Sequence, residues 1–297
     1  MKYLNLTPGF NPQPPSTKDE DIIKFESSTF PGGEPHFRLL NPKDAFNDIT
    51  VIIQLNSFND VGRLLIATDA INRTRNWFKF GEDYIRHLFV PYFPAARQDR
   101  IMINGEALSS KVYANLINDL AYNTVTILDP HSEVIVNMLD NVIVLDNIPY
   151  LDEALDNWRF NLKSRSETFS IVLPDKGAAK KLKTFVKLAN FPTRVYIGEK
   201  KRDLVTGKLS GFDVDCKDFK GEDLFIADDI CDGGGTFMGL AKVLKERNAG
   251  NLYLFVTHGI FSKGFTELNK YFRKIYTTDS FRSSDNGTAL EIINLKI

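Results

Sequence analysis

The sequence predicts an α/β fold of two lobes, each built on a mostly parallel sheet with helices on its faces. Short apolar runs typical of buried strands alternate with segments whose apolar residues recur every three or four positions. Such alternation indicates a parallel sheet, because crossover helices join parallel strands. The pattern begins again near residue 147, and 297 residues with 43% hydrophobic side chains suffice for two cores. We therefore expect domains at 1–147 and 148–297.

The first lobe is expected to begin with an irregular segment at 7–20, which is rich in proline and polar residues. A turn at 30–37 then leads into a strand that ends near Leu40. Apolar residues at helical spacing predict helices at 59–75 and 109–122. The apolar runs that predict the remaining strands of this lobe are 48–55, 86–90, 124–128 and 142–145.

The second lobe repeats this alternation. Residues around Gly207 are expected to form a hairpin, and residues 292–297 are expected to return to the first lobe. The expected strands are 169–173, 194–197, 223–227, 252–257 and 274–278, and the expected helices are 150–162, 178–188, 237–247 and 265–271.

Composition excludes several classes of protein. The formal net charge is −1, so the chain lacks the basic excess that nucleic-acid binding requires. No apolar run approaches 18 residues, and residues 1–5 lack the core of a signal peptide, so we expect no membrane span. Cys216 and Cys231 have neither metal-site spacing nor a disulfide pattern, which predicts a reducing, cytoplasmic compartment.

A glycine-rich loop at 228–236 is the strongest chemical signal. It follows the apolar run 223–227 and precedes a helix, so its backbone N–H groups and the helix N-terminus favour an anion such as phosphate. Asp228 and Asp229 would repel phosphate, and they suit ribose hydroxyls or Mg²⁺ instead. An acidic turn with a helix-capping glycine is the structural alternative. The stretch resembles the ribose-phosphate loop of the phosphoribosyltransferase fold.

A second stretch, 90–100, follows the expected strand at 86–90. Ligands of open α/β sheets bind at this edge. Arg97 and Arg100 offer guanidinium groups suited to phosphate oxygens, and Gln98 can recognise an amide-like ring edge. A surface loop with solvated charges is the alternative.

Together, the loop at 228–236 and the Ala-Arg-Gln-Asp stretch that ends at Asp99 resemble the ribose-phosphate pyrophosphokinases. Members carry a Pro-Tyr…Ala-Arg-Gln-Asp stretch in one lobe and an Asp-Asp-x-x-Asp-x-x-Gly-Thr loop in the other. The resemblance runs in order over about residues 30–280. Supporting matches are Gly105–Lys111, Leu128–His131, Pro174–Gly177, Glu199–Arg202 and Thr257–His258.

This resemblance implies two phosphoribosyltransferase-like lobes and transfer of the β,γ-diphosphate of ATP to the C1 hydroxyl of ribose 5-phosphate, releasing AMP. Mg²⁺ is the implied cofactor, and a homodimer or higher oligomer is implied because the Glu34 loop reaches a neighbouring ATP site. The implied catalytic residues are Lys200 and Arg202, and the implied metal ligands are His131 and Asp175. The implied ATP-binding residues are Gly33, Glu34, Arg97, Gln98, Asp99 and Arg100. The implied ribose-phosphate residues are Asp175, Asp228, Asp229, Asp232, Gly233, Gly234, Gly235 and Thr236.

The chain departs from the family pattern at several positions. Gly32 replaces an Asp, the segment 40–44 lacks the Ser and Arg of the regulatory phosphate site, and only 29 residues precede Phe30. Gly233 replaces a Thr that donates a hydroxyl to a terminal phosphate, and Lys176 adds a positive charge. A smaller loop and an added charge favour a bulkier, more anionic group on the ribose 5-oxygen, so ADP-ribose is an alternative acceptor.

Two further alternatives belong to other functional classes. A non-catalytic, nucleotide-binding family member would lose the cations of the catalytic loop, whereas Lys200 and Arg202 are present here. A phosphoribosyltransferase that uses the finished diphosphate would share only the loop at 228–236. It would not need Arg97, Gln98 and Asp99.

Overall fold

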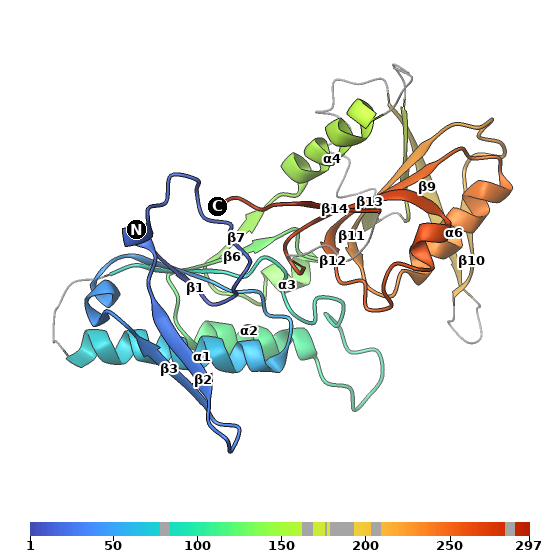
Figure 1. Cartoon of the computed structure of the whole chain (residues 1–297). Helices are drawn as coiled ribbons and strands as arrows, with labels where there is room; N and C mark the ends of the chain where they lie inside the picture. Colours follow the sequence, from blue (N-terminus) through green and yellow to red (C-terminus); the bar gives the residue numbers. More distant parts are fainter. Residues whose placement is uncertain (78–83, 162–168, 176, 179–192, 203–208, 283–288) are drawn as a thin grey trace. The chain divides into compact units, whose positions relative to one another are not determined.

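The computed structural model describes residues 1–77, 84–161, 169–175, 177–178, 193–202, 209–282 and 289–297. The chain divides into two compact units (Figure 1). The first unit contains Met1–Asp146 and the C-terminal residues Asn294–Ile297, and the second contains Asn147–Ile293. Each unit holds a mostly parallel sheet, which confirms the predicted α/β class. In the part of the chain that is described, no helix is both long and apolar enough to cross a membrane.

The sheet of the first unit is parallel throughout, with the order β1-β4-β5-β6-β7. Its first strand was not predicted, because four residues are too few to show a period. Lys2 nevertheless pairs with Ile49, and Leu4 is fully buried. The strands are β1 (Lys2–Asn5), β4 (Ile49–Ile52), β5 (Arg86–Phe89), β6 (Thr124–Leu128) and β7 (Val142–Leu145).

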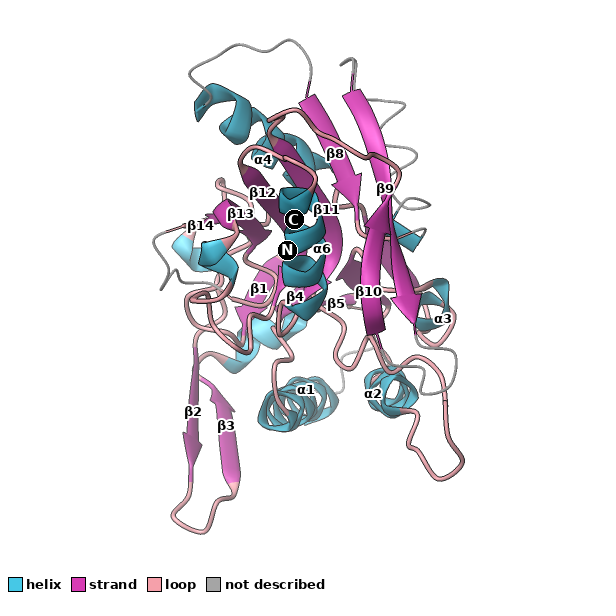
Figure 2. Cartoon of the chain, turned by 90° about the vertical axis from the view of Figure 1, so that its right-hand side faces the viewer, coloured by secondary structure: helices cyan, strands magenta, loops and turns pink. Residues whose placement is uncertain are grey.

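The helices of the first unit confirm the predicted periodicity. Helix α1 (Phe58–Trp77) buries Val61, Leu64 and Ile71, whose spacing puts them on one face. Helix α2 (Ser109–Asp119) runs beside α1 along the same side of the sheet in both views (Figures 1 and 2). Shorter helices are α3 (Glu133–Val136) and the 3₁₀ turns η1 (Asp19–Asp21) and η2 (Pro42–Phe46).

A two-stranded hairpin extends from the first unit (Figure 1). Its strands β2 (Phe25–Thr29) and β3 (Pro35–Leu39) are antiparallel, and the rings of Phe25 and Phe37 stack with centroids 4.9 Å apart. The turn predicted at 30–37 is confirmed as the tip of this hairpin, whereas its first strand was not predicted. Phe25–Thr29 lacks the apolar alternation on which the strand predictions depend.

The sheet of the second unit has the order β10-β9-β8-β11-β12-β13-β14. Only β10 among these described strands runs antiparallel to its neighbour. Strand β14 pairs with β13, so the return to the first unit begins at Asn294, two residues later than predicted. The strands are β8 (Phe169–Leu173), β9 (Thr193–Arg202), β10 (Leu209–Val214), β11 (Leu224–Cys231), β12 (Leu252–Gly259), β13 (Phe272–Thr278) and β14 (Leu290–Ile293).

Helices cover both faces of this second sheet (Figure 2). Side chains of β11 alternate between the two cores, with Leu224 and Ile226 in the core of α6 (Gly235–Glu246) and Phe225 and Ala227 in that of α4 (Ile148–Asn161). The helix predicted at 265–271 is only the 3₁₀ turn η3 (Leu268–Lys270). Most of the helix predicted at 178–188 lies outside the described residues.

Candidate functional site

The glycine-rich loop connects β11 to α6. The sequence predicted that the strand ends at Ala227, but β11 continues to Cys231, so Asp228 and Asp229 belong to the strand. Asp228 is partly exposed, and Asp229 is 9% exposed. Strand β12 extends the pairing, because Ile230 and Cys231 lie opposite His258 and Gly259. The loop proper is therefore short, and both carboxylates are held on a rigid element.

Gly234 fixes the geometry of the loop. Its φ of +76° lies in the left-handed region, and a Cβ atom there would lie only 3.0 Å from the Leu268 side chain. Helix α6 begins at the next residue, so the first N–H groups of α6 are directed at the loop. Gly233 and Gly235 flank Gly234 and have no side chains that would cover the backbone N–H groups. The arrangement can hold a phosphate group by backbone donors alone.

The topology brings a third acidic residue, Asp175, to the same edge of the sheet. From β8 the chain leads to β9 on one side, whereas β11 lies on the other, so β8 and β11 flank a switch point of the sheet. Ligands of open α/β sheets bind at such points. Asp175 follows β8, and its Oδ1 accepts hydrogen bonds from the N–H groups of Gly177 (2.9 Å) and Ala178 (3.0 Å). Lys176 lies outside the described residues.

The segment 260–264 after β12 also contacts the loop, which the sequence analysis did not predict. The Ser262 hydroxyl donates a hydrogen bond of 2.6 Å to Asp232 Oδ1, and its N–H donates to the Asp232 carbonyl at 3.2 Å. The side chain of Lys263 lies beside Gly233. The only signal in the sequence was position, because this segment follows the matched pair Thr257–His258.

The two predicted catalytic residues lie in a strand. The expected strand ended at residue 197, but β9 extends through Arg202 and pairs with β10. Lys200 lies opposite Phe212, and Arg202 opposite Leu209. The hairpin predicted around Gly207 agrees with this pairing, although residues 203–208 lie outside the described residues, as do the side chains of Lys200 and Arg202.

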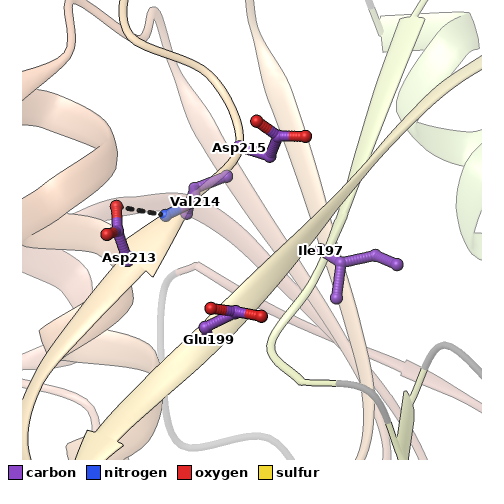
Figure 3. Close-up of a pocket in the computed structure, with 5 residues that line it drawn as sticks. All are labelled: Ile197, Glu199, Asp213, Val214 and Asp215. Carbon is purple, nitrogen blue, oxygen red and sulfur yellow. Dashed lines mark hydrogen bonds between the residues drawn. The ribbon is translucent and has the colours of Figure 1, made fainter.

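A cavity of about 410 Å³ lies next to this β9–β10 pair (Figure 3). Figure 3 shows Asp213 Oδ1 accepting the N–H of Val214 at 2.9 Å, and the same carboxylate pairs with Arg247. The described lining is largely acidic, and carboxylates repel phosphate. The described part of this cavity's lining therefore does not favour a polyphosphate. The lining residues are Ile197, Glu199, Asp213, Val214 and Asp215.

In the first unit, the predicted ATP-binding stretch follows β5. The Val90 N–H donates to the Thr126 carbonyl, and the Leu128 N–H donates to the Pro91 carbonyl, so the stretch begins beside the end of β6. Tyr92 and Phe93 are buried and anchor it. Arg97, Gln98 and Arg100 are exposed, whereas Asp99 is buried.

Asp99 connects this stretch to the residues after β6. Arg100 Nε donates to Asp99 Oδ1 at 3.1 Å. Burial opposes ionisation of Asp99, but the hydrogen bond from Arg100, the nearby Ser132 hydroxyl and the charges of Arg100 and His131 hold its pKa below the usual range. His131 was predicted, whereas Ser132 was not. Asp99 Oδ2 and Ser132 Oγ are buried and lack a well-formed hydrogen bond within the described structure.

Gly33 and Glu34 lie on a separate element, the tip of the β2–β3 hairpin. Gly33 has a φ of +90°, which suits the turn, and both residues are exposed. The predicted ATP-binding residues of the first unit are thus divided between the hairpin tip and the edge of the sheet.

The described residues contain no cluster of three or more potential metal ligands. Mg²⁺ does not require one, because it often binds one or two carboxylates and completes its shell with water and phosphate. Asp99 fits this requirement, because its carboxylate is buried beside His131 and its Oδ2 has no well-formed hydrogen bond within the described structure. In the second unit, the carboxylates of Asp175 and Asp228 are partly exposed at the sheet edge.

Comparisons with known proteins identify the fold and the family of the chain. No protein-family model matches the chain. A solved phosphoribosylpyrophosphate synthetase from Mycobacterium smegmatis has the same fold, with a TM-score of 0.74 at 20% identity over 92% of this chain and 86% of the other.

Curated relatives named ribose-phosphate pyrophosphokinase establish the family. The protein from Methanobrevibacter smithii is 27% identical over 84% of this chain and 82% of its own length. The one from Bradyrhizobium diazoefficiens is 31% identical over 244 residues, which cover 79% of this chain and 71% of the relative. This identity over most of both proteins, together with the shared fold, shows that the chain belongs to the ribose-phosphate pyrophosphokinase family.

Proposed function

We propose that this protein transfers the β,γ-diphosphate of ATP to the C1 hydroxyl of ribose 5-phosphate and releases AMP. The observation that carries the proposal is the loop of Asp228–Thr236 at the switch point of the second sheet, in a chain that belongs to the pyrophosphokinase family. The loop offers phosphate-binding N–H groups and hydroxyl-binding carboxylates within nine residues.

On the acceptor side, the 5-phosphate binds to Asp232–Thr236. The backbone donors and the start of α6 stabilise its charge. Asp228 and Asp229 accept hydrogen bonds from the ribose hydroxyls, and because they lie in β11 they keep a fixed spacing from the loop. Asp175 binds from the neighbouring strand end. This arrangement would orient the C1 hydroxyl for attack, which is the main way that a protein accelerates phosphoryl-group transfer.

On the donor side, Arg97 and Arg100 bind the phosphate oxygens of ATP, and Gln98 recognises the adenine edge. The Arg100 side chain donates a hydrogen bond to the neighbouring Asp99. Gly33 and Glu34 complete an ATP site in a second copy of the chain, because they lie at the tip of an extended hairpin. The active form is accordingly a homodimer or a larger homo-oligomer.

The chemical step is attack of the C1 oxygen on the β-phosphorus of ATP. The bond between the β-phosphorus and the oxygen that bridges it to the α-phosphate breaks, AMP leaves with that oxygen, and the hydroxyl proton goes to solvent. Lys200 and Arg202 stabilise the negative charge on the transferring phosphates, an effect worth about 3–4 kcal/mol per contact in comparable sites. Bound Mg²⁺ would neutralise charge on the polyphosphate. The residues that would hold it are Asp99 and His131 in the first unit, or Asp175 in the second.

The direct test incubates the purified protein with ATP, Mg²⁺ and ribose 5-phosphate. We expect AMP and a ribose 5-phosphate heavier by one diphosphate, in equal amounts, by mass spectrometry. Formation of ADP, or of no nucleotide product, would contradict the proposal. Loss of AMP formation in Lys200→Ala would separate this enzyme from a contaminant and from a non-catalytic family member.

ADP-ribose is the second candidate acceptor, since its C1 hydroxyl is the same nucleophile. The observation in its favour is Gly233, which carries no side chain at the entrance to α6. This candidate predicts faster AMP formation with ADP-ribose than with ribose 5-phosphate. It also predicts that Gly233→Thr shifts the preference toward ribose 5-phosphate, and a shift in the opposite direction would contradict it.

A further inference from the structure

Lys263 lies over the glycine of the loop that lacks a side chain. A Cβ atom at Gly233 would be 3.4 Å from both Cδ and Cε of Lys263 and 3.7 Å from Cγ. These are ordinary van der Waals distances, so the aliphatic part of Lys263 occupies the space that a larger residue at 233 would need. Any larger side chain, such as that of threonine, would displace it.

The backbone that carries Lys263 is fixed to the loop. The N–H groups of Ile260 and Phe261 both donate to the Cys231 carbonyl, at 2.9 and 3.1 Å. Ser262 is bonded to Asp232 through its side chain and its backbone. Phe261 is buried and its ring lies against Phe265, with centroids 4.7 Å apart. Lys263 is therefore presented to the glycine loop by four hydrogen bonds and a buried ring.

The charge of Lys263 suits this position. The loop region contains Asp228, Asp229 and Asp232, and an incoming phosphate adds further negative charge. Within the described structure the Lys263 ammonium makes no hydrogen bond or ion pair, and its side chain is exposed. A flexible stem that rests on glycine and ends in an ammonium can bind phosphate oxygens.

We propose that Lys263 is a specificity-determining residue of the acceptor site, whose ammonium binds the phosphate group carried on the acceptor's 5-oxygen. The proposal rests on the proposed function and deepens it. Gly233 does not simply widen the site, because the Lys263 stem fills the space beside it. Acceptors are thus selected by negative charge at this point rather than by volume.

The test measures steady-state AMP formation with ribose 5-phosphate and with ADP-ribose, in the wild type, Lys263→Met and Lys263→Arg. Methionine keeps an apolar stem and removes the charge. We expect KM for the acceptor to rise about ten- to hundredfold in Lys263→Met, because a charge-assisted hydrogen bond is lost, with KM for ATP unchanged. Lys263→Arg should recover most of the loss. The rise should shrink at high salt, which a packing role would not produce.

Lys270→Met is the matched control, because Lys270 is an exposed lysine on the same connection and pairs with Glu267. It should leave every constant unchanged. A larger rise in KM for ADP-ribose than for ribose 5-phosphate would show that the ammonium binds the outer phosphate of ADP-ribose. A larger rise for ribose 5-phosphate would show that it binds the phosphate attached directly to the 5-oxygen. An acceptor KM within twofold of the wild type for both acceptors would overturn the proposal.

Substitutions of Gly233 provide an independent test of the proposal. Gly233→Ala should change the acceptor KM little, because its Cβ atom would fit 3.4 Å from the Lys263 side chain. Gly233→Thr should raise the acceptor KM, because the larger side chain would displace Lys263. The threonine effect should disappear in the Lys263→Met background, as expected of residues in contact. If the wild type forms AMP with neither acceptor, the proposed function fails. The role of Lys263 is then decided by calorimetric binding of ribose 5-phosphate to the wild type and Lys263→Met, where equal affinity would overturn it.

Discussion

The two units present their candidate binding residues in different ways. In the second unit, backbone geometry forms the site: a strand end, a left-handed glycine and a helix start create it around Asp228–Thr236. In the first unit, the described strands follow the order β1-β4-β5-β6-β7 without a switch point, and the proposed contacts depend on the exposed side chains of Arg97, Gln98 and Arg100. A site built from backbone is ready before the ligand arrives. A site built from exposed side chains must be ordered by the ligand.

The largest loss of activity is expected at the two proposed catalytic residues, Lys200 and Arg202. Lys200→Ala and Arg202→Ala should each lower kcat about 10²- to 10³-fold with little change in either KM, because their contacts are made in the transition state. Single-turnover AMP formation would measure the effect. The control is Lys242→Ala, an exposed lysine on α6. A change confined to KM would reassign these residues to substrate binding.

In the first unit, Arg97→Ala should raise KM for ATP about tenfold, since one charge-assisted phosphate contact is lost. KM for the acceptor should stay constant, because we propose that the acceptor binds the glycine-rich loop of the second unit. Arg73→Ala, which removes an exposed ion pair with Asp69 on α1, is the control. Equal changes in both KM values would contradict the separation of the two half-sites.

In the second unit, Gly234→Ala should destabilise the protein by about 1–2 kcal/mol, because alanine at φ +76° is strained and its Cβ would contact Leu268 at 3.0 Å. Urea unfolding would measure this. Gly235→Ala is the matched variant. It lies at the start of α6 with no atom within 4 Å of its Cβ position, so its stability should stay equal or rise slightly. Equal losses of unfolding free energy in both variants would contradict the requirement for glycine at position 234.

Asp99→Asn should have the smallest effect, a loss of about 1 kcal/mol at pH 7. The pKa of Asp99 is lowered on folding, so its ionised form stabilises the native state above the unfolded pKa of about 3.9. That contribution is lost as the pH falls through the lower, native pKa. The difference between wild type and Asp99→Asn in unfolding free energy should therefore narrow below about pH 4. A difference that stays constant down to pH 3 would contradict the assignment.

Much of the fold followed from periodicity. Long amphipathic helices such as α1 and buried strands such as β6 were predicted nearly to the residue, because their apolar residues repeat regularly. Strand β1 was missed, since Lys2–Asn5 is recognised only through pairing with β4. The predicted strand 194–197 was too short, because the charged run after it gives no apolar signal, and pairing with β10 extends β9 through Arg202.

The candidate site shows the same division. The loop at 228–236 and the Arg97–Arg100 stretch were found because each lies in one continuous segment. Ser132 and Lys263 were not predicted, because each is brought into the candidate site by a contact with a residue far away in the sequence. Ser132 lies near Asp99, and Lys263 lies beside Gly233. Only the neighbouring strand ends, β5 with β6 and β11 with β12, bring these pairs together.

The most direct test of the proposed reaction follows the β-phosphorus of ATP. The wild-type protein would be incubated with Mg²⁺, ATP that carries ³²P at the β position, and ribose 5-phosphate or ADP-ribose, and the products separated by chromatography. We predict that the label moves to the sugar while unlabelled AMP is released. Label that remains in ADP would show transfer of the γ-phosphate alone, and it would contradict pyrophosphoryl transfer by this protein.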